Sequence, residues 1–111
     1  MKIAISSTGK NLNDDVAEVF GRCSYFIIVE VENQKLGKPE ILENKNMDQV
    51  SGAGVSVAQV VAEKNIDVVI TRNIGPRALD VLRQFNIKIY SGDGVIKDAL
   101  QKFIDEKLKE I

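Results

Sequence analysis

The sequence predicts a three-layer α/β/α domain built on a five-stranded mixed sheet. In the second half of the chain, short apolar runs alternate with helical patterns, which is typical of parallel strands joined by right-handed crossovers. In the first half, two strand-like runs flank a turn that contains Gly37, which is typical of a hairpin. The chain has 111 residues, 44% of them hydrophobic, and we expect one domain over residues 1–111.

Five segments are predicted as strands because they are rich in apolar, β-branched or aromatic residues. They are 2–6, 25–31, 39–43, 67–71 and 87–90. The first, fourth and fifth look buried on both faces, as central parallel strands are. Pro39 and the charges near it place the third strand at an edge. We therefore expect the strand order 3-2-1-4-5, with the second strand antiparallel.

Three helices are predicted to cover both faces of this sheet. Apolar residues recur at helical spacing over residues 54–64, 76–85 and 95–109. Pro76 begins the second helix, where its missing N–H is tolerated. Asp93 is the expected N-cap of the third helix.

The predicted topology brings four loops to one edge of the sheet. Ligands of open α/β sheets bind beyond the carboxyl ends of the strands. The first and fourth strands end at that edge, and the second strand, which runs the other way, begins there. The segments that we expect to meet are 6–10, 20–24, 51–54 and 71–77.

The residues of these loops suit an anionic ligand. Gly52 and Gly54 begin one helix and Gly75 precedes the next, so the backbone could approach a ligand closely and offer free N–H groups. The same loops hold polar side chains that could donate to the ligand. These side chains are Arg22, Arg72, Asn73 and Arg77. The alternative is that the glycines only form tight turns at strand ends.

Cys23 is the single cysteine and the candidate metal ligand. Arg22 beside it would lower the pKa of the thiol and favour a thiolate, which suits one metal contact. Alternatively, Cys23 is a small buried apolar residue. Because one cysteine cannot form an internal disulfide, we expect a reduced, cytoplasmic protein.

Several classes of function are excluded by composition and motifs. The net charge of -1 lacks the basic excess of a nucleic-acid-binding protein, and no apolar run is long enough to span a membrane. No phosphate loop or dinucleotide fingerprint is present, and a catalytic triad is impossible without histidine. The first strand, KIAIS, lacks the acidic residue of a two-metal nuclease. We therefore expect a protein that is not an enzyme.

The sequence resembles the dinitrogenase iron-molybdenum cofactor biosynthesis family, the nitrogenase accessory-factor-like domains, over nearly the whole chain. The matching features are the opening KIAI, the FGR of residues 20–22, the pair Gly52 and Gly54, and DVVI followed by IGPRAL at residues 67–79. FGR and IGPRA at this separation form the specific part of the pattern. The resemblance implies a ribonuclease-H-like fold.

The resemblance also implies a carrier of iron–sulfur or iron-molybdenum cofactor precursors and a client metalloprotein as partner. Many relatives have a histidine before FGR and another before the glycine pair, where this chain has Val19 and Ser51. Iron–sulfur clusters usually take four soft ligands, and a homodimer would supply two Cys23 thiolates. The alternative function is a small-anion-binding or protein-interaction module.

Overall fold

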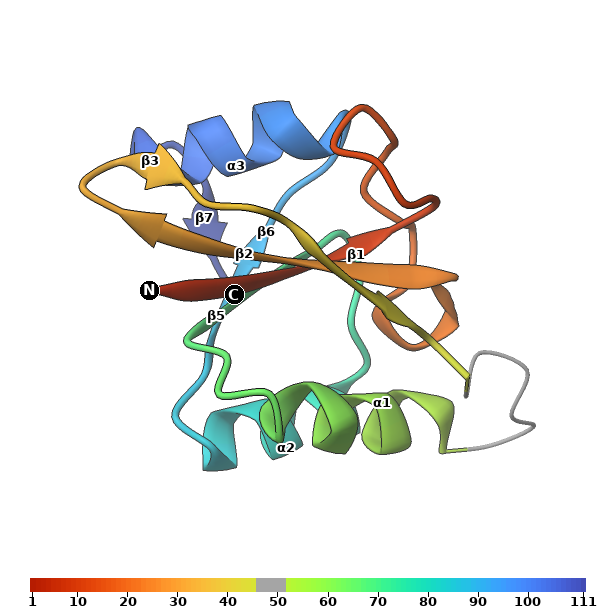
Figure 1. Ribbon diagram of the computed structural model, residues 1–111. Helices are drawn as coiled ribbons and strands as arrows, with labels where there is room; N and C mark the ends of the chain where they lie inside the picture. Colours follow the sequence, from red (N-terminus) through yellow and green to blue (C-terminus); the bar gives the residue numbers. More distant parts are fainter. Residues whose placement is uncertain (46–51) are drawn as a thin grey trace.

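The protein is organised around a mixed β-sheet, as a computed structural model that describes residues 1–45 and 52–111 shows (Figure 1). Within these residues the sheet has the order β3-β2-β1-β5-β6-β7, and β4 also pairs with β2. The strands are β1 (Lys2–Ser7), β2 (Tyr25–Glu32), β3 (Lys35–Leu36), β4 (Glu40–Glu43), β5 (Val68–Thr71), β6 (Lys88–Ser91) and β7 (Lys109–Glu110).

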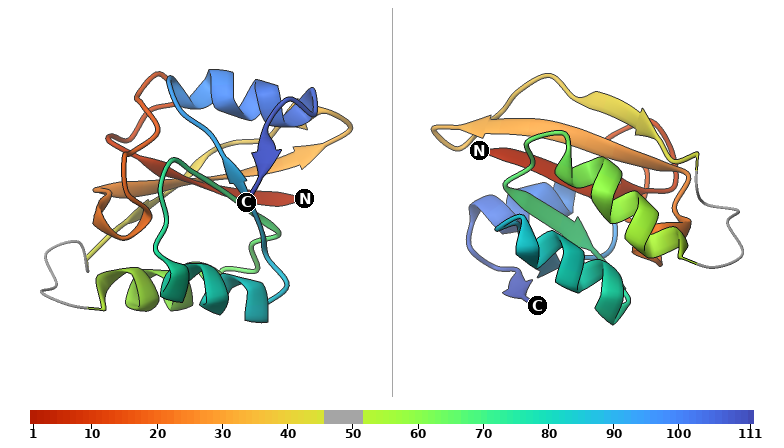
Figure 2. Two further views of the ribbon diagram at one scale, coloured as in Figure 1. Left: turned by 180° about the vertical axis from the view of Figure 1, so that it is seen from behind. Right: turned by 90° about the horizontal axis from the view of Figure 1, so that it is seen from below.

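The predicted three layers are present (Figures 1 and 2). Helices α1 (Ala53–Ala62) and α2 (Pro76–Gln84) lie on one face of the sheet, and α3 (Ile96–Ile104) lies on the other. Successive residues of a strand point to opposite faces. Accordingly, Ala4 belongs to the core under α1 and α2, whereas Ile3 and Ile5 belong to the core under α3.

The five expected strands pair in the expected order. β1 is antiparallel to β2 and parallel to β5, β5 is parallel to β6, and β4 is antiparallel to β2. The expected total of five strands is wrong, because β3 and β7 add short pairs to the sheet. β3 forms because Asn33 and Gln34 both take positive φ angles, 51° and 66°, which fit the right-handed twist of a two-residue hairpin turn.

The C-terminal segment also differs from the expectation of one long helix. α3 ends at Ile104 and Glu106 has a φ of 59°, so the chain turns back and β7 pairs antiparallel with β6. The N-cap of α3 is Val95, not Asp93 as expected. Val95 makes no side-chain hydrogen bond to the helix, so this helix start has no capping residue that could be recognised in the sequence. Instead, the carbonyl of Asp14 accepts a hydrogen bond from the amide of Ile96 at 2.9 Å.

Among the described residues, no helix is both long enough and apolar enough to cross a membrane.

Candidate functional site

The carboxyl ends of β1 and β5 meet the start of β2, as the topology predicted. Ser7 at the end of β1 pairs with Tyr25 at the start of β2. The hydroxyls of Ser6 and Thr71 lie 2.9 Å apart in a hydrogen bond, and both residues are fully buried. These hydroxyls therefore join β1 to β5 beneath the loops and leave the loops themselves to form the site.

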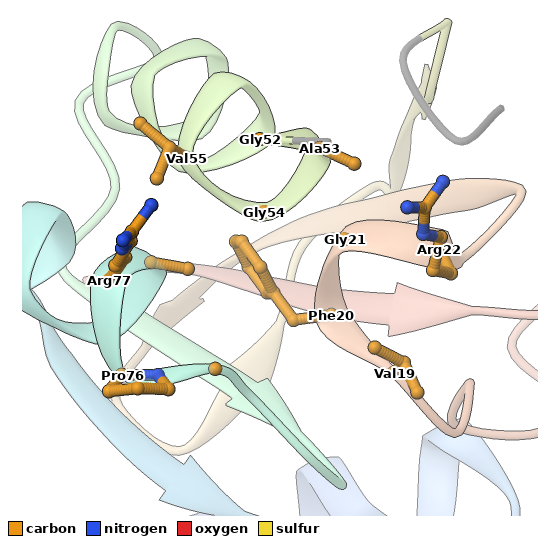
Figure 3. Close-up of a pocket in the computed structure, with 12 residues that line it drawn as sticks. Val19, Phe20, Gly21, Arg22, Gly52, Ala53, Gly54, Val55, Pro76 and Arg77 are labelled. Atoms are coloured by element: carbon orange, nitrogen blue, oxygen red, sulfur yellow. The ribbon is translucent and has the colours of Figure 1, made fainter. Parts of the chain in front are cut away.

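A cavity of about 400 Å³ lies among loops and helix starts that follow these strand ends (Figure 3). Three backbone segments form it, namely the 3-10 turn η1 (Phe20–Arg22), the first turn of α1 and the first turn of α2. We call it the rim cavity. Its lining residues are Val19, Phe20, Gly21, Arg22, Gly52, Ala53, Gly54, Val55, Gly75, Pro76, Arg77 and Ala78.

The rim cavity gathers five of the residues that the sequence proposed for ligand binding. These residues are Arg22, Gly52, Gly54, Gly75 and Arg77. Arg22 and Arg77 are drawn on opposite sides of the cavity, with Gly54 and Phe20 between them (Figure 3). Two positively charged side chains from segments far apart in the sequence thus flank one opening.

Close backbone packing explains the glycine of the FGR turn. A β-carbon on Gly21 would lie 2.8 Å from both the Cα and the amide nitrogen of Gly54. Only a residue without a side chain lets η1 approach α1 this closely. Gly54 is in turn close to α2, because its β-carbon would lie 3.3 Å from that of Ala78.

Two helix N-termini border the rim cavity, and each follows a glycine. Gly52 precedes α1 with a φ of 73° and Gly75 precedes α2, so neither N-cap residue has a side chain that could cap its helix. Neither first turn contains an acidic residue, and the described lining residues include no carboxylate. Both helix dipoles therefore add partial positive charge to that of the two guanidinium groups.

Two further candidates, Arg72 and Asn73, lie in the loop between β5 and α2. Neither is among the described residues that line the rim cavity. Arg72 is exposed. The side chain of Asn73 donates a hydrogen bond to the carbonyl of Glu18 at 2.9 Å, and its carbonyl accepts one from the amide of Phe20 at 2.9 Å. Asn73 therefore connects the loop after β5 to the segment that leads into η1.

Cys23 is buried, with 3% of its surface exposed. Its thiol donates to the carbonyl of Phe20 at 3.3 Å. Burial raises the pKa of the Cys23 thiol from 9.0 to about 11, so the expectation that Arg22 would favour a thiolate is wrong. Cys23 borders a separate cavity of about 300 Å³ and does not line the rim cavity.

The described residues contain no group of three or more histidine, cysteine, aspartate or glutamate side chains that could hold a metal ion. Ser51, one of the two positions where the family resemblance led us to look for a histidine, lies outside the described residues. The donor set that is described suits a ligand held by ionic contacts and N–H groups rather than by coordination to protein atoms.

The sequence reasoning missed the apolar side of the rim cavity. Val19, Phe20, Val55, Pro76 and Ala78 line it beside the arginines. Phe20, Pro76 and Ala78 belong to the FGR and IGPRA motifs, of which only the charged and glycine positions were interpreted as ligand contacts. Val19 and Val55 lie outside both motifs.

This fold and site define a small α/β/α protein with a cavity at the carboxyl end of its sheet, and the described lining of that cavity includes two arginines and two helix N-termini. Residues 1–106 match the dinitrogenase iron-molybdenum cofactor family, and the chain belongs to that family. It is 33% identical over 111 residues to an uncharacterized protein of Methanocaldococcus jannaschii, MJ0580, covering 99% of this chain and 91% of that one.

Two solved structures of similar proteins share the fold. The apo form of the orange protein from Desulfovibrio gigas has a TM-score of 0.90 and 28% sequence identity, covering 99% of this chain and 92% of that one. A putative NifB protein from Thermotoga has a TM-score of 0.83 and 32% identity, covering 98% of this chain and 91% of that one.

Proposed function

We propose that this protein is a non-catalytic carrier that binds a preassembled anionic metal cluster, an iron–sulfur species or an iron-molybdenum cofactor precursor, in the rim cavity. The observation that carries the proposal is the meeting of Arg22, Arg77 and two helix N-termini with glycine N-caps around one cavity. Membership of the dinitrogenase iron-molybdenum cofactor family supports the class of cargo.

The volume of the rim cavity supports a cargo of several atoms. A volume of about 400 Å³ falls within the range of small-molecule sites. A single tetrahedral oxyanion would leave much of this space to water. A polynuclear cluster would use both the charged and the apolar parts of the lining.

The cargo would bring its own ligands to the metal. The described lining offers no thiol, imidazole or carboxylate, and the Cys23 thiol is buried and protonated at neutral pH. Arg22 and Arg77 would then neutralise the charge of the cargo, while amides of the first helical turns donate to its peripheral atoms. The same lack of a nucleophile or an acid–base pair supports carriage rather than catalysis.

Reconstitution tests this proposal in solution. The purified protein would be incubated anaerobically with ferrous iron, sulfide and molybdate, desalted, and analysed for metal content and visible absorption. We expect wild type to retain metal and Gly75→Val to retain much less, because a side chain there fills open space in the rim cavity. Metal-free wild type, or a variant that retains as much metal as wild type, would contradict the proposal.

The second candidate function is a small-anion-binding module that uses the same two arginines and helix N-termini. Thermal shifts with phosphate, nucleotides and molybdate distinguish it from a carrier. Stabilisation by these simple anions, without retention of iron, would favour the module. A protein-interaction role, a homodimer and a client metalloprotein also remain proposals, and size-exclusion chromatography with and without cargo would test the homodimer.

The cytoplasm is the proposed location, because the single cysteine is free. The ribonuclease-H-like description of the fold is also part of the proposal. It rests on the order β4-β2-β1-β5-β6 with an antiparallel β2.

A further inference from the structure

Asn73 makes two hydrogen bonds to the segment that leads into η1, on the side of the rim cavity where Arg22 lies. Its side-chain nitrogen donates to the carbonyl of Glu18 at 2.9 Å. Its own carbonyl accepts from the amide of Phe20 at 2.9 Å. One residue of the loop after β5 therefore holds the residues on both sides of Val19.

These bonds lead directly to Arg22. Val19 and Asn73 pair as an isolated parallel bridge, and the carbonyl of Val19 accepts from the amide of Arg22 at 3.2 Å. This last bond closes the η1 turn. The place of the Arg22 backbone thus depends on Val19, and the place of Val19 depends on Asn73.

Asn73 is also close in sequence to the first turn of α2, which lines the rim cavity opposite η1. Asn73 precedes Gly75, the N-cap of α2, by two residues, and the carbonyl of Gly75 accepts from the amide of Leu79 at 3.0 Å. Arg77 lies in this first turn. Because only Ile74 separates Asn73 from Gly75, the position of Asn73 is fixed relative to α2. The hydrogen bonds of Asn73 to residues 18–20 therefore set the spacing between η1, which carries Arg22, and the first turn of α2, which carries Arg77.

We propose that Asn73 is a positioning residue that holds residues 18–22 against the start of α2 and thereby sets where Arg22 meets an anionic ligand. The inference rests on the proposed function of the rim cavity. It assigns Asn73 a role different from the direct ligand contact that the sequence indicated, since Asn73 is not among the described lining residues and one of its two amide N–H groups donates to Glu18. Its amide oxygen is an acceptor and would not attract an anion.

The first arm of the test needs no ligand. Asn73→Ala removes one of the two hydrogen bonds, and hydrogen exchange at the Phe20 amide should become roughly 2- to 12-fold faster, the range expected for one net hydrogen bond. Asn73→Ser is a second variant with a shortened side chain. Asn13→Ala, at an exposed asparagine of the loop after β1, is the matched control and should leave this exchange unchanged. Unchanged exchange in both Asn73 variants would overturn the inference.

The second arm uses molybdate as the probe and follows the side-chain Nε resonances of the arginines by NMR. In wild type we expect both Arg22 and Arg77 to shift with molybdate. In Asn73→Ala we expect the Arg22 response to weaken severalfold while that of Arg77 is retained, which a general loss of stability would not produce. Equal responses of both arginines in the variant and in wild type would overturn the positioning role.

The two arms separate the inference from the function on which it rests. If wild type shows no response to molybdate or to the iron, sulfide and molybdate mixture, the proposed function fails, and with it the role of Asn73 in ligand binding. Hydrogen exchange at the Phe20 amide would still decide whether Asn73 holds residues 18–22 in place. A response in wild type with unchanged Phe20 exchange in the variants would overturn the inference alone.

Discussion

Gly21 and Gly54 are in backbone contact, so close that a β-carbon on Gly21 would lie 2.8 Å from the Gly54 Cα. This contact joins the FGR turn to the first turn of α1 and forms one corner of the rim cavity. The FGR motif thus has a packing role at its glycine and a binding role, under our proposal, at its arginine.

Gly21→Ala should destabilise the protein. The added methyl group meets backbone atoms that cannot rotate away, so η1 and α1 must separate, and such overpacking costs about 1–3 kcal/mol. Urea denaturation would measure the change in the free energy of unfolding. Gly75→Ala is the matched control, because its β-carbon meets nothing within 4 Å and its φ is −70°. We expect the control to cost less than about 1 kcal/mol, and an equal cost in the two variants would contradict the packing account.

Cys23 should make the stability depend on alkaline pH. Its folded pKa of about 11 lies above the ordinary value of 9.0. Below pH 9 the thiol is protonated in both states and contributes no pH dependence. Between about pH 9 and 11 only the unfolded thiol ionises, so the stability should fall with rising pH by about 1.4 kcal/mol per unit at most. Cys23→Ala should lack this component when both proteins are unfolded with urea across this range, and identical pH profiles would contradict the burial of the thiol.

The same burial predicts slow alkylation. Iodoacetamide at pH 8 should modify Cys23 in urea but hardly at all in the native protein, because the reactive thiolate is scarce and the sulfur is covered. Mass spectrometry would follow the reaction. Rapid modification of the native protein would show that Cys23 is more accessible than its 3% exposed surface indicates.

Arg77 and Arg72 form a natural pair for testing ligand binding. Both are exposed and lie five positions apart, Arg72 in the loop after β5 and Arg77 in the first turn of α2, and only Arg77 is among the described lining residues of the rim cavity. Arg77→Ala should weaken molybdate binding about fivefold at low salt, because an exposed ion pair is worth up to about 1 kcal/mol. Arg72→Ala should have a smaller effect. Isothermal titration calorimetry at two salt concentrations would measure both, and the difference should shrink at high salt. Equal effects of the two substitutions on the molybdate affinity would contradict binding in the rim cavity.

Much of the fold could be predicted because the determinants are local. The apolar runs of β1 and β5 showed buried central strands, and Pro76 marked the start of α2. The expectation that β6 is also buried on both faces is wrong, because Lys88 and Ser91 are exposed. β7 could not be predicted, because Lys109 and Glu110 carry no strand signal and pair with β6 only after Glu106 turns the chain.

The candidate site was predictable to the extent that motif positions determine it. FGR and IGPR do meet, and they bring Arg22 and Arg77 to one cavity. The hydrogen bonds of Asn73 depend on a tertiary contact with Glu18 that no spacing reveals. The pKa of Cys23 likewise depends on burial by residues distant in the sequence, and its neighbour Arg22 suggested the opposite shift.

Under the proposed function, Arg22 and Arg77 hold an anionic metal cluster in the rim cavity. The most direct measurement is the metal content of the protein isolated anaerobically from its own host, for wild type and for the double variant Arg22→Ala, Arg77→Ala. Arg83→Ala, at an arginine of α2 outside the rim cavity, is the control. We predict iron or molybdenum with visible absorption in wild type and in the control, and a severalfold loss in the double variant. Wild type free of both metals, or a double variant with as much metal as wild type, would contradict the account.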